Sequence, residues 1–134
     1  MTEKIVIDAE NATMGRLASF SAKQALLGKE VAIVNVEKAI ITGNRKDILE
    51  TYKQKRRRHG SSLKGPIFSR DTEKIFKRTI RGMLSWKRGR GIAALDRIRC
   101  YKGVPGELES VKKIKAGKVK GNKFMKIEEV AELL

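Results

Sequence analysis

The stretch that decides the fold is IVIDAENATMGRLASFSAKQALLGKEVAIVNV, residues 5–36. Its two ends, 5–9 and 31–36, are consecutive apolar runs, which is typical of strands covered on both faces. Between them, residues 14–27 carry apolar and small side chains at helical spacing, and Gly28 is a suitable helix stop. Strand, helix and strand in this order predict a βαβ unit, which has a right-handed crossover and forms a parallel sheet.

The remaining sequence predicts helices and short strands around this unit. No repeat and no Gly/Ser linker divides the chain, so we expect one α/β domain over residues 1–134, with a less regular tail from about 107. We first expect a β-prone stretch at 39–43 and a helix from 45 to about 58 with Ile48, Leu49 and Tyr52 on its apolar side. A second helix is expected from Asp71 or Thr72 to about Leu84, packed through Ile75, Phe76, Ile80 and Met83, and it is followed by a basic turn at 87–91 and a helical turn from 92. The last expected elements are a strand at 98–101, a strand at 124–127 and a helix at 128–134.

Charge is concentrated in one part of the sequence. The chain has 31 basic and 15 acidic residues, a net charge of +16, and its 40% hydrophobic content separates it from disordered basic tails. Residues 1–42 are neutral, residues 43–103 hold 19 basic and five acidic residues, and residues 104–134 have a net charge of +2. A surplus confined to one segment can form a directed face, which favours a polyanionic partner.

Two clusters supply most candidate phosphate contacts. Five of the six positions 53–58 are basic, and the second cluster is Lys87-Arg88-Gly89-Arg90-Gly91. Arginine can bind phosphate oxygens in a bidentate manner, and glycine allows a close backbone approach. A solvated helix end and a tight turn that happens to be basic are the alternatives. Arg16 and Arg81 are secondary candidates, so the full set is Arg16, Lys53, Lys55, Arg56, Arg57, Arg58, Arg81, Lys87, Arg88 and Arg90.

Aromatic residues are few. The chain has only seven and they form no stacking series, so we expect RNA binding to rest on phosphates and shape. Trp86 and His59 lie near the basic clusters and offer base stacking. A core or rim position is the favoured interpretation for Trp86.

Signals for an enzyme are weak. The sequence has neither a GxxxxGK[ST] nor a GxGxxG motif. Asp8 and Glu37 follow successive strands, where α/β enzymes place their sites, but no histidine or metal ligand accompanies them. Gly15 is expected to serve close packing rather than phosphate binding. Cys100 is expected to be a small buried hydrophobe rather than a nucleophile.

Other protein classes are also disfavoured. No run of about 18 apolar residues predicts a membrane helix, and the N-terminal stretch has no signal-peptide pattern. One cysteine and one histidine cannot form a disulfide or a structural zinc site within the chain. We therefore expect a cytoplasmic protein with no membrane, cofactor, metal or small-molecule substrate.

An ordered series of short motifs resembles the ribosomal protein L-thirteen family of the large subunit, in its archaeal form. The motifs are Asp8-Ala9, Met14-Gly15-Arg16-Leu17-Ala18-Ser19, Val34-Asn35-Val36-Glu37-Lys38, Thr42-Gly43, Gly65-Pro66, Arg81-Gly82-Met83-Leu84, Arg90-Gly91 and Tyr101-Lys102-Gly103-Val104-Pro105. The resemblance covers about residues 5–106. It implies a three-layer α/β/α fold with a mostly parallel four-stranded sheet. It also implies binding to large-subunit ribosomal RNA, among neighbouring ribosomal proteins, and no catalysis.

The leading hypothesis is therefore a structural ribosomal RNA-binding protein that supports subunit assembly. A small enzyme that uses a nucleotide or polyanion, with its site near Asp8, Gly15 and Glu37, is the second hypothesis. A DNA-compacting protein is the third.

Overall fold

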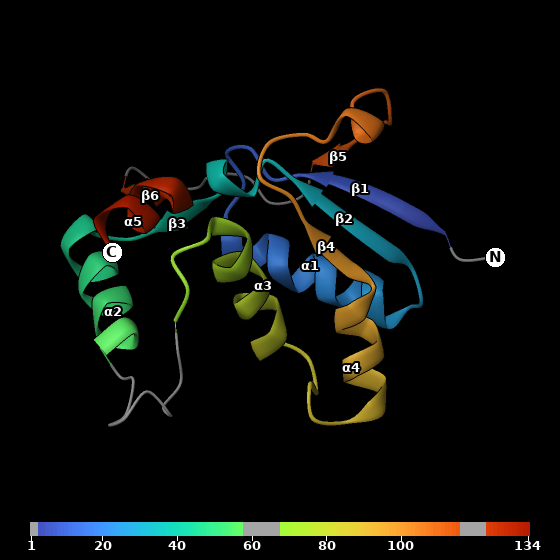
Figure 1. Cartoon of the computed structure of the whole chain (residues 1–134), viewed down its shortest axis with the longest axis horizontal. Helices are drawn as coiled ribbons and strands as arrows, with labels where there is room; N and C mark the ends of the chain where they lie inside the picture. Colours follow the sequence, from blue (N-terminus) through green and yellow to red (C-terminus); the bar gives the residue numbers. More distant parts are fainter. Residues whose placement is uncertain (1–2, 58–67, 116–122) are drawn as a thin grey trace.

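The computed structural model describes residues 3–57, 68–115 and 123–134 (Figure 1). Elements alternate between strands and helices in the first half, and short strands and helices follow. Their order is β1 (Lys4–Asp8), α1 (Met14–Leu26), β2 (Glu30–Val34), the 3-10 turn η1 (Val36–Lys38), β3 (Ile40–Thr42), α2 (Arg45–Arg57), α3 (Thr72–Gly82), α4 (Gly89–Asp96), β4 (Ile98–Cys100), the 3-10 turn η3 (Gly106–Leu108), β5 (Ile114–Lys115), β6 (Phe124–Lys126) and α5 (Ile127–Leu133).

The main sheet has four strands in the order β4-β2-β1-β5, and all of its pairs are parallel. Val6 of β1 is paired with Ala32 of β2, and Val31 of β2 with Ile98 of β4. A separate antiparallel pair joins β3 to β6. The predicted α/β class with a parallel four-stranded sheet is confirmed. One domain over residues 1–134 stays a prediction.

The consecutive apolar runs of β1 and β2 supply both faces of the sheet. Ile7, Val31 and Ile33 join the larger cluster, beneath α1, α3 and α4. The alternate residues Val6 and Ala32 belong to the second cluster with Leu108 of η3, as expected because successive side chains in a strand point to opposite faces. The layer opposite the helices is thus formed by the segment around η3 (Figure 1).

Helix α1 packs on the sheet through a stripe of small residues. Ala18, Ser21, Ala22 and Ala25 are buried, and their short side chains allow the helix to lie close to its neighbours. Gly28, with φ of 94°, follows the helix in the left-handed conformation that glycine adopts without strain. The predicted helix stop is confirmed.

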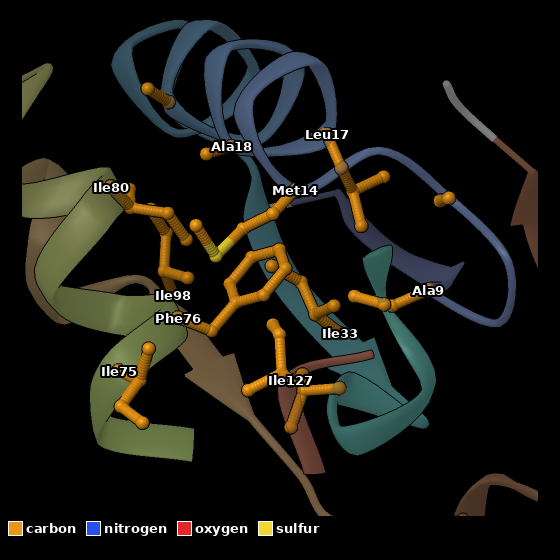
Figure 2. Packing of buried hydrophobic residues seen from close by; sticks show 14 of the residues in the cluster. Ala9, Met14, Leu17, Ala18, Ile33, Ile75, Phe76, Ile80, Ile98 and Ile127 are labelled. Carbon is orange, nitrogen blue, oxygen red and sulfur yellow. The ribbon is translucent and has the colours of Figure 1, made fainter. Parts of the chain in front are cut away.

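Helix α3 fills the centre of the core. Ile75, Phe76 and Ile80 are buried as predicted, and Figure 2 shows Phe76 pointing toward Met14, Ile33 and Ile127. Met83 does not join them. The helix ends at Gly82, and the side chain of Met83 is 45% exposed in the following turn.

Two further details differ from the expectation. Residues 87–91 are only partly a turn, because α4 already begins at Gly89. A Cβ atom at Gly91 would collide with the backbone of Ser85, so the first turn of α4 lies directly against the 83–88 turn. Strand β5, which completes the sheet, had no counterpart among the predicted elements.

Candidate nucleic-acid interface

Basic residues from α2, from the end of α3 with the 83–88 turn, and from the start of α4 gather at one end of the molecule. In Figure 1 the C-terminal ends of α2 and α3 and the N-terminal end of α4 lie toward the lower edge, whereas β1, β2 and β5 lie toward the upper edge. The basic end, as we call this region, comprises Lys53, Lys55, Arg56, Arg57, Arg78, Arg81, Lys87, Arg88 and Arg90. The helix dipole favours cations at the ends of α2 and α3, which explains their helical placement but not their number.

On the α2 side, two cations lie over two aromatic rings. The Tyr52 and Phe68 ring centroids are 5.7 Å apart with the ring planes at 61°, an edge-to-face arrangement. Lys55 Nζ lies 5.0 Å from the Tyr52 centroid, and Arg78 Cζ lies 4.9 Å from the Phe68 centroid. Burial raises the pKa of Tyr52, so its phenol stays protonated. These contacts hold the two cationic side chains in place beside the rings.

On the α3 side, Trp86 carries two more cations. Arg81 Cζ is 4.9 Å and Lys87 Nζ is 5.0 Å from the Trp86 ring centroid. The Trp86 side chain is 43% exposed, which places it at the rim and outside the core. A large aromatic ring at the surface between two cations is the type of residue that meets a partner.

The two sides face a common hollow of about 300 Å³. Its lining combines rings with cations: Tyr52, Lys55, Phe68, Ile75, Arg78, Thr79, Arg81, Gly82 and Trp86. Two residues of the predicted interface, Lys55 and Arg81, therefore meet at one site although they are 26 positions apart in the sequence.

The other predicted residues are distributed around this hollow or away from it. Lys53 and Arg57 are exposed on α2, where Arg56 is half-buried. Arg88 and Arg90 are exposed at the start of α4. Lys87 lies over the ring of Trp86, which lines the hollow. Arg16 is exposed on α1, away from the residues that line the hollow. Arg58 and His59 lie outside the described residues.

Sequence reasoning missed two of the aromatic walls. Tyr52 had been assigned only to the apolar side of its helix, and Phe68 had no assigned role. A signal for Arg78 was present, because it lies three positions before Arg81 and so on the same face of a helix.

Carboxylates do little to neutralise the basic end. Among described residues, the ion pairs are Lys29–Glu3 at 3.7 Å and Lys74–Asp71 at 3.6 Å between nitrogen and oxygen. Neither pair includes one of the exposed cations Lys53, Arg57, Lys87, Arg88 and Arg90. The positive charge of these five residues is therefore available to an external polyanion.

The carboxylates of the second hypothesis have structural roles. Asp8 Oδ1 accepts hydrogen bonds from the Glu10 backbone at 3.0 Å and from Asn35 Nδ2 at 3.1 Å. Glu37 Oε2 accepts one from the Gly103 N–H at 3.0 Å. These bonds tie together the loops at the carboxyl ends of β1, β2 and β4. The edge where an α/β enzyme would place its chemistry is thus occupied by a structural network.

Gly15 and Cys100 are the other two residues for which the sequence raised the question of phosphate binding or catalysis. The prediction that Gly15 serves close packing is wrong, because it is exposed and a Cβ there would meet nothing within 4 Å. Burial raises the pKa of the Cys100 thiol to about 12, an effect opposed by Lys77 and reinforced by Glu73. A neutral thiol is a poor nucleophile, in agreement with the predicted packing role.

The described part of the chain has neither a cluster of metal ligands nor a helix that could cross a membrane. No group of three or more metal-ligating side chains occurs within residues 3–57, 68–115 and 123–134. In the same ranges, no helix has the length and apolar character needed to cross a membrane.

Comparison with known proteins identifies the family. The model of the family described as ribosomal protein L13 matches residues 2–107. The large ribosomal subunit protein uL13 of Archaeoglobus fulgidus is 48% identical over 92% of this chain and 72% of its own length. The proteins of that name from Methanopyrus kandleri and Methanococcoides burtonii are 50% and 42% identical, over 80% and 96% of this chain and 67% and 96% of their own lengths. The resemblance expected from the short motifs is confirmed, with archaeal relatives, and the chain belongs to the ribosomal protein L13 family.

Proposed function

We propose that this protein is a structural constituent of the large ribosomal subunit that binds large-subunit ribosomal RNA through its basic end and thereby supports subunit assembly. The observation that carries the proposal is the convergence of cations from α2, α3 and α4 at one end, where the exposed Lys53, Arg57, Arg88 and Arg90 belong to neither ion pair of the described residues. Family membership supplies the ribosome as the setting, and the family is one of structural proteins rather than enzymes.

The proposed contacts act mainly on phosphates. Each lysine or arginine that reaches a phosphate releases condensed counterions, and this release supplies most of the sequence-independent affinity. Arg57, Arg88 and Arg90 can bind phosphate oxygens in a bidentate manner, whereas Lys53 and Lys55 act as point charges. Arg16, Arg56, Arg58, Arg81 and Lys87 complete the proposed set.

Neighbouring ribosomal proteins are the second class of partner that we propose. The segment that holds β1, α1 and β2, residues 1–42, is neutral in sequence, so it offers a surface that does not repel other basic proteins of the subunit.

The salt dependence of RNA binding tests the proposal. If five or six phosphates are neutralised, the slope of log K against log salt for large-subunit ribosomal RNA is about −4 to −5. A flat dependence in a filter-binding titration would overturn phosphate binding by the basic end. Duplex DNA at matched salt serves as the comparison, and tighter binding to DNA would favour the compaction hypothesis.

Cofractionation tests the setting. In a sucrose gradient of a cell extract, the protein is expected to sediment with the large subunit at low salt and to leave it at high salt. Sedimentation only at the top of the gradient at low salt would contradict a place in the subunit.

A further inference from the structure

The hollow between α2 and α3 has chemistry that phosphate binding alone does not require. Phosphates need cations, which the exposed surface of the basic end already offers. The hollow adds the rings of Tyr52, Phe68 and Trp86, and two of its cations are arginines stacked on rings. Aromatic faces and guanidinium planes are the surfaces on which unpaired RNA bases stack.

The two arginines extend the aromatic walls. Arg78 and Arg81 are one helical turn apart on α3, with Arg78 over Phe68 and Arg81 over Trp86 at 4.9 Å each. A group entering the hollow therefore meets planar guanidinium groups backed by rings. Lys55, held over Tyr52, adds a point charge to the lining.

The size and shape of the hollow limit what it can accept. Its volume of about 300 Å³ is at the low end of the range of about 300–1,000 Å³ for small-molecule sites, which suits one base and not a helix. A second hollow of about 290 Å³ shares Phe68, Arg78 and Arg81 as walls. An RNA strand that leaves the first hollow can therefore continue along this second, cationic hollow.

We infer that this hollow is a base-binding site that takes one unpaired nucleotide of RNA. The base stacks on the ring and guanidinium walls of Phe68, Arg78, Arg81 and Trp86, and its phosphates lie near Lys55 and Lys87. The inference rests on the proposed function, because the nucleotide belongs to the RNA that the basic end binds. It adds that the protein requires an extruded base and not only a charged backbone.

Binding of short RNA to the chain of residues 1–134 tests the inference. The probes are a short single-stranded oligoadenylate and an abasic ribose-phosphate oligomer of the same length, which carries the same phosphates without bases. Trp86 is the only tryptophan of the chain, so its fluorescence reports on the hollow directly. We expect oligoadenylate to bind about 5- to 150-fold more tightly than the abasic oligomer, and it alone to quench the fluorescence. Equal affinity for the two oligomers would overturn the inference.

Matched variants locate the effect. Trp86→Leu is expected to remove most of the preference for oligoadenylate, whereas Phe124→Leu on β6 retains it; the two side chains are 43% and 44% exposed. Arg81→Lys keeps the charge but lacks the planar group, so it is expected to lower the ratio of the affinities for oligoadenylate and for the abasic oligomer. If Trp86→Leu retains the full preference for oligoadenylate over the abasic oligomer, the proposed site is overturned. The same holds if Trp86→Leu and Phe124→Leu lose equal parts of that preference.

The same titrations separate this inference from the proposed function. Wild-type protein that binds ribosomal RNA with the expected salt slope but shows no base preference retains the proposed function and loses the base-binding site. Wild-type protein whose binding to ribosomal RNA is insensitive to salt loses the proposed function itself.

Discussion

The sheet core and the basic end differ in whether their polar groups have hydrogen-bond partners within the chain. In the sheet core, formed by β1, β2, β4 and α1, polar groups have partners within the chain: Asn35 donates to Asp8, and Arg97 Nη1 donates to the carbonyl oxygen of Ala25 at 2.8 Å. At the basic end, cations lie on rings or extend into solvent. The first region is internally satisfied, whereas the second has donors and charge that an external surface can match.

The difference also separates stability from binding. The buried apolar clusters lie along the sheet and α3, and the charge surplus lies at the helix ends. Self-repulsion among these cations disfavours the compact state, and salt or a polyanion relieves it. Changes in one region are therefore expected to affect either unfolding or RNA binding, and four predictions test this division.

The largest effect is expected for the thiol in the sheet core. Because burial raises the pKa of Cys100 from 9.0 to about 12, the thiolate fraction at pH 8 is expected to be roughly 1,000-fold smaller in the native protein than in denaturant, and alkylation is expected to be slower. The thiol's contribution to stability is present below pH 9 and is lost as the pH rises toward 12, because the unfolded thiol ionises first. Equal iodoacetamide rates in the two states would contradict a closed sheet core.

The next largest effect concerns charge. Replacing Lys53, Arg57 and Arg88 with glutamine is expected to reduce the salt slope by about 2 to 3 and to weaken ribosomal RNA binding about 100- to 1,000-fold at 0.1 M salt. The control removes the same charge from the first 42 residues by replacing Lys4, Lys23 and Lys38 with glutamine. If filter binding shows equal losses for both triple variants, the charge acts through the whole molecule and not through the basic end. Thermal unfolding checks that both remain folded.

Gly91 lies where α4 meets the 83–88 turn, and its replacement is expected to destabilise the protein. Gly91→Ala places a methyl group against the backbone of Ser85, and the required shift is expected to lower the free energy of unfolding by about 2–3 kcal/mol. Gly89→Ala, two positions earlier in the same helix, meets nothing within 4 Å and serves as the control. Urea unfolding measures both variants, and a neutral Gly91→Ala would show that the 83–88 turn moves freely.

The smallest effect is expected at Gly15. It lies in α1 with open space where a side chain would be, so Gly15→Ala is expected to raise the free energy of unfolding by about 0.5–1 kcal/mol. A decrease in urea unfolding would restore a packing role for this glycine. A loss of ribosomal RNA affinity without a loss of stability would instead indicate that RNA approaches the backbone beside Arg16.

The sequence predicts the centre of the fold well because its signals there are local. Consecutive apolar runs at β1 and β2 and helical spacing in α1 need no knowledge of distant residues. Strand β5 has no such signal, because Ile114 and Lys115 are both exposed and only pairing with β1 defines them as a strand. Met83 continued the helical spacing of α3, but the chain leaves the helix one residue earlier.

The candidate site was predictable in its charge and in the ring of Trp86, but not as a hollow. Basic clusters can be counted along the sequence, and their helices bring them to one end. The hollow depends on Phe68, which precedes α3 and meets the ring of Tyr52 on α2, and on Arg78 and Arg81 of α3, which line the same space. No spacing rule in one sequence predicts that meeting.

The order of strands in the sheet has a consequence for how the chain folds during synthesis. Strand β1 is made first, yet its outer neighbour, β5, lies more than 100 residues later in the sequence. Strand β3 likewise pairs with a strand that is made much later, β6. Pairings so distant in sequence are slow to form because long loops must close first. The nascent chain can thus build β1, α1 and β2 early, while the edge of β3 that pairs with β6 and the outer edge of β1 stay unpaired until the C-terminal segment emerges.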